Sequence, residues 1–334
     1  RLPRVVGVEK ALDMITGGKP ISADEALAVG LVDDVVDGGP AELEAAAVTF
    51  ARSLVAEGRP LVKISARDEK VQGVEPAVFA AARKQVAAKQ RGFDAPPAII
   101  DCIEATTTGT FAEGLKYEQK RFIGLMTGPQ SAAQRYAFFA ERAANKIPGV
   151  DKDTPIADVR SVGVLGAGTM GGGIAMNFAN VGIPVTIVER DQESLARGLG
   201  VVRKNYERSA SRGSISAADV ETRMALITGS TDKNDFAQCD LVIEAVFENM
   251  DLKKSVFREL DSICKPGAIL ASNTSMLDIN VIAAETERPE SVIGLHFFSP
   301  ANVMKLLEIV RGDATSPAVV ASSMAIAKRI GKVA

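Results

Sequence analysis

The chain contains a single histidine, His296, in the segment GLHFFSP, and Glu308 follows it in the segment KLLEIV. Imidazole is the side chain best suited to exchange a proton near neutral pH. A chain reversal at Pro300 would place two antiparallel segments side by side, with the Glu308 carboxylate against one ring nitrogen of His296. Such a pair predicts a general base with an orienting carboxylate. The alternatives are a buried structural histidine, because two phenylalanines follow it, and a Glu308 that merely faces solvent.

A glycine-rich segment, GAGTMG at 166–171, directly follows an apolar run that predicts a strand. The spacing G-x-G-x-x-G between a strand and a helix is typical of dinucleotide-binding turns. Gly166 would permit the tight turn, Gly168 would let backbone amides approach a pyrophosphate, and Gly171 would let the helix pack closely on the strand. Met170 belongs to the same turn and is counted with the cofactor-binding residues. A glycine turn without a ligand, or one that binds FAD, is the alternative.

The second predicted strand ends at Glu189, which Arg190 follows. An acidic side chain about 20 residues after such a turn is expected to bind the ribose hydroxyls of NAD and to repel the 2′-phosphate of NADP. Arg190 argues the other way, because an arginine at this place can hold a 2′-phosphate. We predict NAD as the cofactor.

Two further strand ends carry polar side chains. In ASNTS, Asn273 and Ser275 can bond a substrate oxygen, although Ser275 with Asp278 also fits a helix N-cap. In EAVFENMDLKKSVF, Glu248 and Lys253 are expected to face the cofactor, although an acidic residue at a helix start is also common. Because ligands bind outside the carboxyl ends of strands in open α/β sheets, we expect these groups to meet His296.

The elements that must position these residues change in kind along the chain. Short β-branched runs after residue 160 alternate with helical segments, which predicts an α/β fold with a Rossmann-type, doubly wound parallel sheet. These runs are 161–165, 184–188, 241–246, 268–272 and 291–295. The preceding region reads as mostly helical, with helices near 41–57 and through 75–146, one short strand at 31–36, and a linker at 146–159 rich in Pro, Gly and Asp.

Length and composition set outer limits on function. The 334 residues predict two or three domains, and a net charge of −3 gives no broad case for binding nucleic acid. The three cysteines show no metal-ligand spacing and are expected to be reduced thiols. No apolar run is long enough to span a membrane, and the first residues do not resemble a signal peptide. Both ends interrupt a pattern, so we expect a piece of a longer chain.

Residues 160–334 resemble the NAD-binding domain of L-3-hydroxyacyl-CoA dehydrogenases, through GVLGAGTMGGGIA, VIEAVFEN, ASNTS and GLHFFSPANVMKLLEIV. The resemblance implies a catalytic base, its orienting partner and a hydrogen-bond donor to the substrate oxygen at His296, Glu308 and Ser275. It also implies a ribose-binding acid at Glu189, a cofactor-side pair at Glu248 and Lys253, and a basic residue near the CoA phosphates at Arg212, with Arg208 one turn before it. In that family a following helical domain completes the site with an Asn, so this chain alone is expected to bind NAD but to catalyse weakly or not at all.

The first half has a resemblance of its own. Its segment VGVEKALDMITGGKPISADEALAVGLVDDVV resembles the C-terminal part of enoyl-CoA hydratase/isomerase (crotonase) domains, without their catalytic carboxylates. We therefore predict three parts: the end of a crotonase domain at 1–58, a helical extension and linker at 59–150, and the NAD-binding domain at 159–334.

Together the resemblances imply a multifunctional fatty-acid β-oxidation enzyme that oxidises (3S)-3-hydroxyacyl-CoA to 3-oxoacyl-CoA. An NAD-binding structural module attached to a hydratase/isomerase, and a hydratase with the second half as a passenger, are the alternatives. The expected partners are an acyl-CoA substrate and either a thiolase or further copies of the chain. The expected compartment is the bacterial cytoplasm, or a peroxisome or mitochondrion if the source is eukaryotic.

Overall fold

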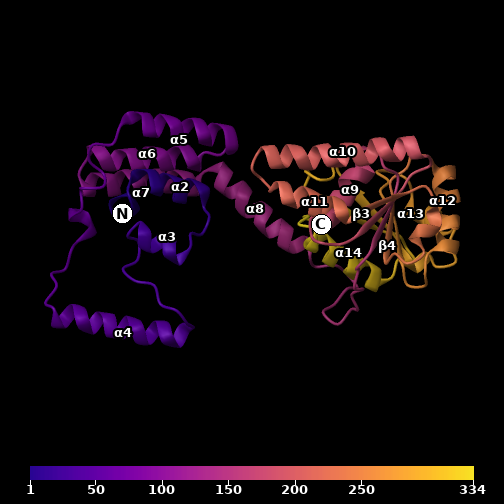
Figure 1. Cartoon of the computed structure of the whole chain (residues 1–334), viewed down its shortest axis with the longest axis horizontal. Helices are drawn as coiled ribbons and strands as arrows, with labels where there is room; N and C mark the ends of the chain where they lie inside the picture. The colour runs from indigo at the N-terminus through magenta and orange to yellow at the C-terminus, as the bar shows by residue number, and fades with distance from the viewer. The chain divides into compact units, whose positions relative to one another are not determined.

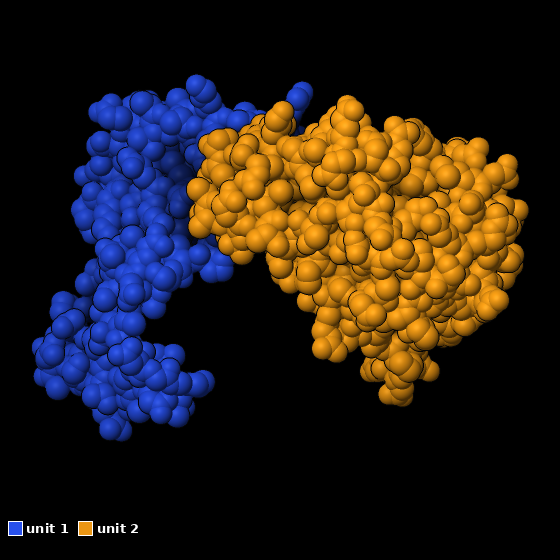
Figure 2. Space-filling model, turned by 45° about the vertical axis from the view of Figure 1, so that its right-hand side comes forward, with its two compact units in different colours: residues 1–138 blue, residues 139–334 orange.

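The computed structural model describes all 334 residues and divides them into two compact units, residues 1–138 and 139–334 (Figure 2). Each unit has its own buried core. The three-part division at 1–58, 59–150 and 159–334 stays a prediction.

The first unit is helical, as expected. Its longer helices are α2 (Val8–Gly17), α4 (Pro40–Ala56), α5 (Pro76–Lys89), α6 (Ala95–Thr108) and α7 (Phe111–Thr127). The shorter ones are α1 (Leu2–Val6), α3 (Ala23–Ala28) and the 3₁₀ turn Ile64–Ala66, and α8 (Pro129–Ala144) leads into the second unit. Apolar side chains of α2, α5 and α6 form the core, whereas α4 has no buried residue.

The strand expected at 31–36 does not form, and that prediction was wrong. Residues 31–36 are turn and irregular backbone, with Leu31, Val32 and Val36 exposed. A strand needs a neighbour to satisfy its backbone groups, and residues 1–138 contain no other strand. Gly30, just past the end of α3, has a φ of +76°, a left-handed conformation that is common in the residue after a helix C-cap.

The second unit is built on one seven-stranded sheet (Figure 1). Its strands are β1 (Val162–Leu165), β2 (Val185–Val188), β3 (Ile227–Ser230), β4 (Leu241–Glu244), β5 (Ile269–Ser272), β6 (Val292–Phe297) and β7 (Leu307–Arg311). The order is β3-β2-β1-β4-β5-β6-β7; every neighbouring pair is parallel except β6 and β7. The predicted doubly wound parallel sheet is confirmed.

Helices cover both faces of this sheet. One core includes side chains of α9 (Thr169–Ala179), α10 (Gln192–Ser211), α11 (Ala217–Ala225) and α14 (Pro317–Arg329). The other includes side chains of α12 (Met250–Ile263), α13 (Ile279–Ala283) and the 3₁₀ turn Lys233–Phe236; a further 3₁₀ turn at Pro289–Ser291 leads into β6. β1, β4 and β5 are buried along their whole length, as expected for strands covered on both faces. None of the helices has the length and apolarity that crossing a membrane requires.

The fold brings most of the candidate site residues to one edge of the sheet, at the carboxyl ends of the parallel strands. Because β1, β2, β4, β5 and β6 run parallel, the segments that follow them leave at the same edge. β7 returns antiparallel to β6, and its register places Glu308 directly opposite His296. The predicted chain reversal near Pro300 is therefore confirmed.

Candidate active site

The glycine turn after β1 has three glycines in three different environments. Gly166 has a φ of +106°, and a Cβ there would lie 2.8 Å from the carbonyl oxygen of Ala245. A Cβ at Gly171 would lie 1.8 Å from the carbonyl oxygen of Gly166, so α9 contacts the turn without any space for a side chain. Gly168, by contrast, is exposed and has open space where its Cβ would be. Two glycines therefore build the turn, and the third keeps its outer surface clear.

These environments predict different effects for glycine-to-alanine substitutions at Gly171 and Gly168. Gly171→Ala is expected to lower the free energy of unfolding by about 1–3 kcal/mol, because the new methyl group must displace backbone. Gly168→Ala is expected to lower the free energy of unfolding by less than about 1 kcal/mol, because alanine is a poorer N-cap than glycine. It is also expected to weaken NADH binding, because the methyl group occupies the surface that a pyrophosphate approaches. Equal unfolding curves for the two variants would contradict this account.

The first turn of α9 offers backbone donors to an anion. Gly168 is the N-cap residue and no side chain caps the helix, so the first amides of the helix have no intrahelical partner. Met170, half-buried, packs its side chain against the core below the turn. The open surface at Gly168 and the uncapped amides fit the phosphates of a dinucleotide.

Glu189, just past the end of β2, is tied to the glycine turn. Its carboxylate accepts the N–H of Ala167 at 2.9 Å and the N–H of Arg190 at 2.8 Å. The guanidinium of Arg190 pairs instead with Asp191 at 2.9 Å. The Glu189 carboxylate therefore borders the glycine turn where a ribose would lie, while the Arg190 guanidinium is paired with Asp191.

His296 and Glu308 form a direct contact across β6 and β7. His296 Nδ1 lies 2.8 Å from Glu308 Oε2, and the His296 side chain is 18 % exposed. The ring of Phe298 lies 4.6 Å from the imidazole between centroids, tilted by 47°, while Phe297 is buried in the core. His296 Nε2 has no partner within the chain, so one nitrogen is oriented and the other is available to a ligand.

Glu248, after β4, binds the turn that follows β5. Its carboxylate accepts the Thr274 hydroxyl at 2.6 Å, the Ser275 N–H at 2.9 Å and the Ser275 hydroxyl at 3.3 Å. Lys253 Nζ lies 3.3 Å away. Burial raises the pKa of Glu248, but these hydrogen bonds and the Lys253 charge outweigh burial and lower the pKa below its ordinary value. Glu248, Lys253 and Ser275 are thus brought together, with Glu248 ionised.

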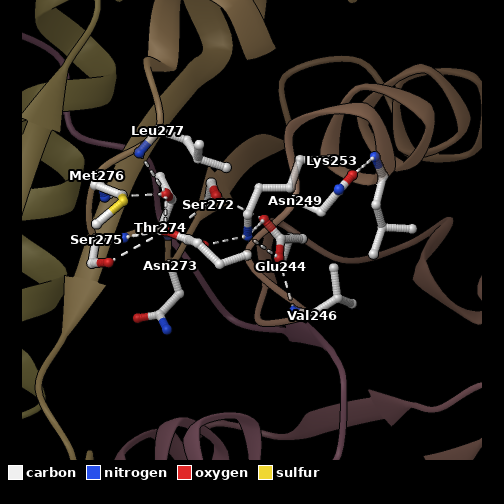
Figure 3. A network of polar contacts seen from close by, with 12 residues as sticks. Glu244, Val246, Asn249, Lys253, Ser272, Asn273, Thr274, Ser275, Met276 and Leu277 are labelled. Atoms are coloured by element: carbon white, nitrogen blue, oxygen red, sulfur yellow. Dashed lines mark hydrogen bonds and ion pairs between the residues drawn. The ribbon is translucent and has the colours of Figure 1, made fainter.

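A buried carboxylate behind this group was missed by sequence reasoning. Glu244, the last residue of β4, is fully buried and binds Lys253 and Ser272 (Figure 3). The signal was present, because a charged residue that ends the apolar run LVIE is unusual unless it has a partner. Without the register of β4 and β5, which pairs Glu244 with Ser272, that partner is not visible.

The remaining predicted residues lie in different places. The Oδ1 of Asn273 accepts the N–H of Phe297 at 2.8 Å, which ties the end of β5 to the strand that carries His296. Ser275 does not cap a helix: Asp278 is the N-cap of α13, so that alternative was wrong. Arg212 is exposed and follows the last residue of α10. This helix of 20 residues starts just after the end of β2 and is about 30 Å long. The structure therefore does not bring Arg212 to the other residues.

A doubly wound sheet with this glycine turn, and with an acidic side chain after its second strand, defines a dinucleotide-binding domain of the dehydrogenase type. Residues 161–334 match the family described as "3-hydroxyacyl-CoA dehydrogenase, NAD binding domain", and the chain belongs to this family.

Relatives agree with this assignment over different parts of the chain. The chain is 42 % identical over 337 residues to the peroxisomal bifunctional enzyme of Cavia porcellus, a match that spans all of this chain and 46 % of the relative. The crystal structure of 3-hydroxybutyryl-CoA dehydrogenase from Escherichia coli K12 is 39 % identical, with a TM-score of 0.52 over 53 % of this chain and 37 % of the other. That of the dehydrogenase part of multifunctional enzyme 1 from C. elegans is 34 % identical, with a TM-score of 0.52 over 56 % of this chain and 44 % of the other. The chain thus spans about half the length of the curated relatives it matches.

Proposed function

We propose that the chain supplies the NAD site and the catalytic base of a longer enzyme that oxidises (3S)-3-hydroxyacyl-CoA to 3-oxoacyl-CoA. The observation that carries this proposal is the 2.8 Å contact between His296 and Glu308 at the sheet edge that also bears the glycine turn. The family supports NAD as cofactor and a 3-hydroxyacyl-CoA as substrate class.

The pair provides the proton transfer. His296 Nε2 removes the proton of the substrate hydroxyl, while the hydrogen on the carbon that bears this hydroxyl leaves as hydride. Bound NAD⁺ supplies the hydride acceptor. Glu308, held at Nδ1, fixes the tautomer that leaves Nε2 unprotonated and then stabilises the imidazolium. Phe298 packs on the ring and limits its rotation.

Ser275 has the role of a hydrogen-bond donor to the substrate oxygen. Its hydroxyl contacts Glu248 at 3.3 Å, a long bond that is easily exchanged for one to an oxygen that gains negative charge. Asn273 is proposed to lie on the substrate side of the site with Ser275. It accepts a hydrogen bond from the N–H of Phe297, which places the end of β5 beside His296. Arg212 is proposed to contact the distal phosphates of a CoA, at the far end of α10.

The cofactor side is assigned to the glycine turn, Met170, Glu189, Glu248 and Lys253. Glu189 would bond the ribose hydroxyls, and its charge beside the turn disfavours the 2′-phosphate of NADP. The chain should therefore bind NADH more tightly than NADPH. Glu189→Ala is expected to remove most of that preference, and fluorescence titration with the two reduced cofactors measures it. Equal affinity of the unmodified chain for both cofactors would refute the assignment.

The longer enzyme is proposed to be a multifunctional β-oxidation protein, since the curated relatives are named bifunctional or multifunctional. Residues 1–58 would end its crotonase domain and 59–150 would extend it. Peroxisomal relatives favour a peroxisomal setting, while the bacterial cytoplasm stays a prediction supported by bacterial solved structures. A thiolase or a second copy of the chain stays a predicted partner.

The test has two parts. Calorimetric titration of the 334-residue chain with NAD⁺ should show saturable binding at one site. The longer enzyme should reduce acetoacetyl-CoA with NADH. A longer enzyme that hydrates enoyl-CoA but shows neither NADH binding nor reduction would instead support the hydratase alternative, and NADH binding without reduction would support the structural-module alternative.

A further inference from the structure

The Glu244 carboxylate lies at the centre of a polar network that the roles above do not explain (Figure 3). The side chains of Glu244 and Lys253 are 0 % and 1 % exposed. Lys253 Nζ donates to both carboxylate oxygens, at 2.6 and 2.8 Å. Ser272 Oγ donates to the same group at 2.7 Å and the N–H of Val246 at 2.8 Å. This buried charge is therefore satisfied entirely by protein groups from β5, α12 and the segment that follows β4.

Lys253 links Glu244 to Glu248. Its ammonium group donates hydrogen bonds to both carboxylate oxygens of Glu244 and forms an ion pair with Glu248, whose Oε2 lies 3.3 Å away. The carboxylate of Glu248 in turn holds Thr274 and Ser275. Lys253 can therefore affect a bound ligand through Glu248.

We propose that Glu244 is a positioning residue for the cofactor side of the site. Its carboxylate fixes Lys253, Lys253 fixes Glu248, and Glu248 fixes the turn that carries Ser275. A buried ion pair gives a fold little that apolar side chains of similar volume would not, so stability alone does not account for it. This inference rests on the proposed function, because it assumes that Glu248 serves a bound NAD.

The same contacts set the charge of Glu248. Lys253 of α12 is the only charged side chain in contact with Glu248; Glu244 of β4 lies behind Lys253, and the turn after β5 offers only uncharged donors. Lys253 is among the groups that lower the pKa of Glu248. Removal of the Lys253 charge therefore raises that pKa, and the pH below which Glu248 becomes protonated and releases the turn rises with it.

The experiment uses a charge-balanced variant of the chain, Glu244→Gln with Lys253→Met, which removes both buried charges at nearly constant volume. NADH affinity is measured by fluorescence titration as a function of pH, and the melting temperature is measured in parallel. We expect a melting temperature within a few degrees of the original, an affinity about tenfold weaker, and an acid limb of the binding profile shifted to higher pH. The exposed pair Lys233 and Glu259, changed to Met and Gln, is the matched control and should alter none of these quantities.

A second comparison separates positioning from a direct contact. In a chain that already carries Glu248→Gln, the charge-balanced variant should weaken NADH binding less than twofold, because its effect passes through Glu248. The proposal is overturned if the loss is the same in both backgrounds, or if the charge-balanced variant alone binds NADH as the original chain does at every pH. An original chain that does not bind NADH would refute the proposed function instead.

Discussion

Replacement of His296 by Gln in the longer enzyme is expected to lower kcat for the oxidation of a 3-hydroxyacyl-CoA by about 10³-fold, within the range that a positioned base contributes. Glutamine keeps the size and polarity of the side chain but cannot accept the hydroxyl proton. Glu308→Gln is expected to lower kcat by a smaller factor, because His296 remains and loses only the carboxylate 2.8 Å from Nδ1. The oxidation of a 3-hydroxyacyl-CoA and the reverse reduction of acetoacetyl-CoA, each followed by NADH absorbance, measure the effect of both substitutions.

Binding and a second activity supply the controls for this prediction. NADH affinity should be the same for His296→Gln and the unmodified enzyme, because the glycine turn and Glu189 lie on other strands. Any hydratase activity of the longer enzyme should also be unchanged. Survival of reduction at a rate near that of the unmodified enzyme would refute His296 as the base and return it to the structural role that its phenylalanine neighbours first suggested.

The single substitution Lys253→Met is expected to lower the free energy of unfolding of the second unit by about 3–5 kcal/mol. It leaves the Glu244 carboxylate, 0 % exposed, without its cation. Urea-induced unfolding followed by circular dichroism measures the loss. The control is Lys233→Met. Its partner Glu259 is 44 % exposed, so loss of this ion pair should lower the free energy of unfolding by at most about 1 kcal/mol.

Equal stability of Lys253→Met and the control would contradict this prediction. If Lys253→Met unfolds at the same urea concentration as the control, the Glu244 carboxylate must be reached by water, and the ion pair would not be a buried contact. Recovery of stability on adding Glu244→Gln to Lys253→Met would support the ion pair, since the second change removes the charge left behind.

Much of the second unit was predictable because its strands are short, β-branched and separated by helical segments. β3 was the exception: ITGS contains one large apolar residue, and its two central residues are exposed, so it has no apolar pattern to detect. It is a strand because it pairs with β2 at the sheet edge. The error at 31–36 is the converse, since an apolar pattern there found no strand to pair with.

The candidate site also has parts that could be predicted from the sequence and parts that could not. The glycine turn and the contact between His296 and Glu308 followed from spacing, because each depends on residues close in the sequence. The network around Glu244 did not, because it joins three elements whose contact depends on sheet order and register. The role of Arg212 near the CoA phosphates stays a prediction, and the length of α10 sets this residue apart from the strand ends that carry the other candidates.

The antiparallel register of β6 and β7 has a consequence for how this site tolerates insertions and deletions. Side chains alternate between faces along a strand, so His296 and Glu308 share one face while Phe297 and Leu307, also paired, are buried on the other. A shift of β7 by one residue would separate the catalytic pair and would also force Leu307 out of the core. Length changes within β7 should therefore not be accepted, and the cost of exposing Leu307 keeps the carboxylate opposite the imidazole.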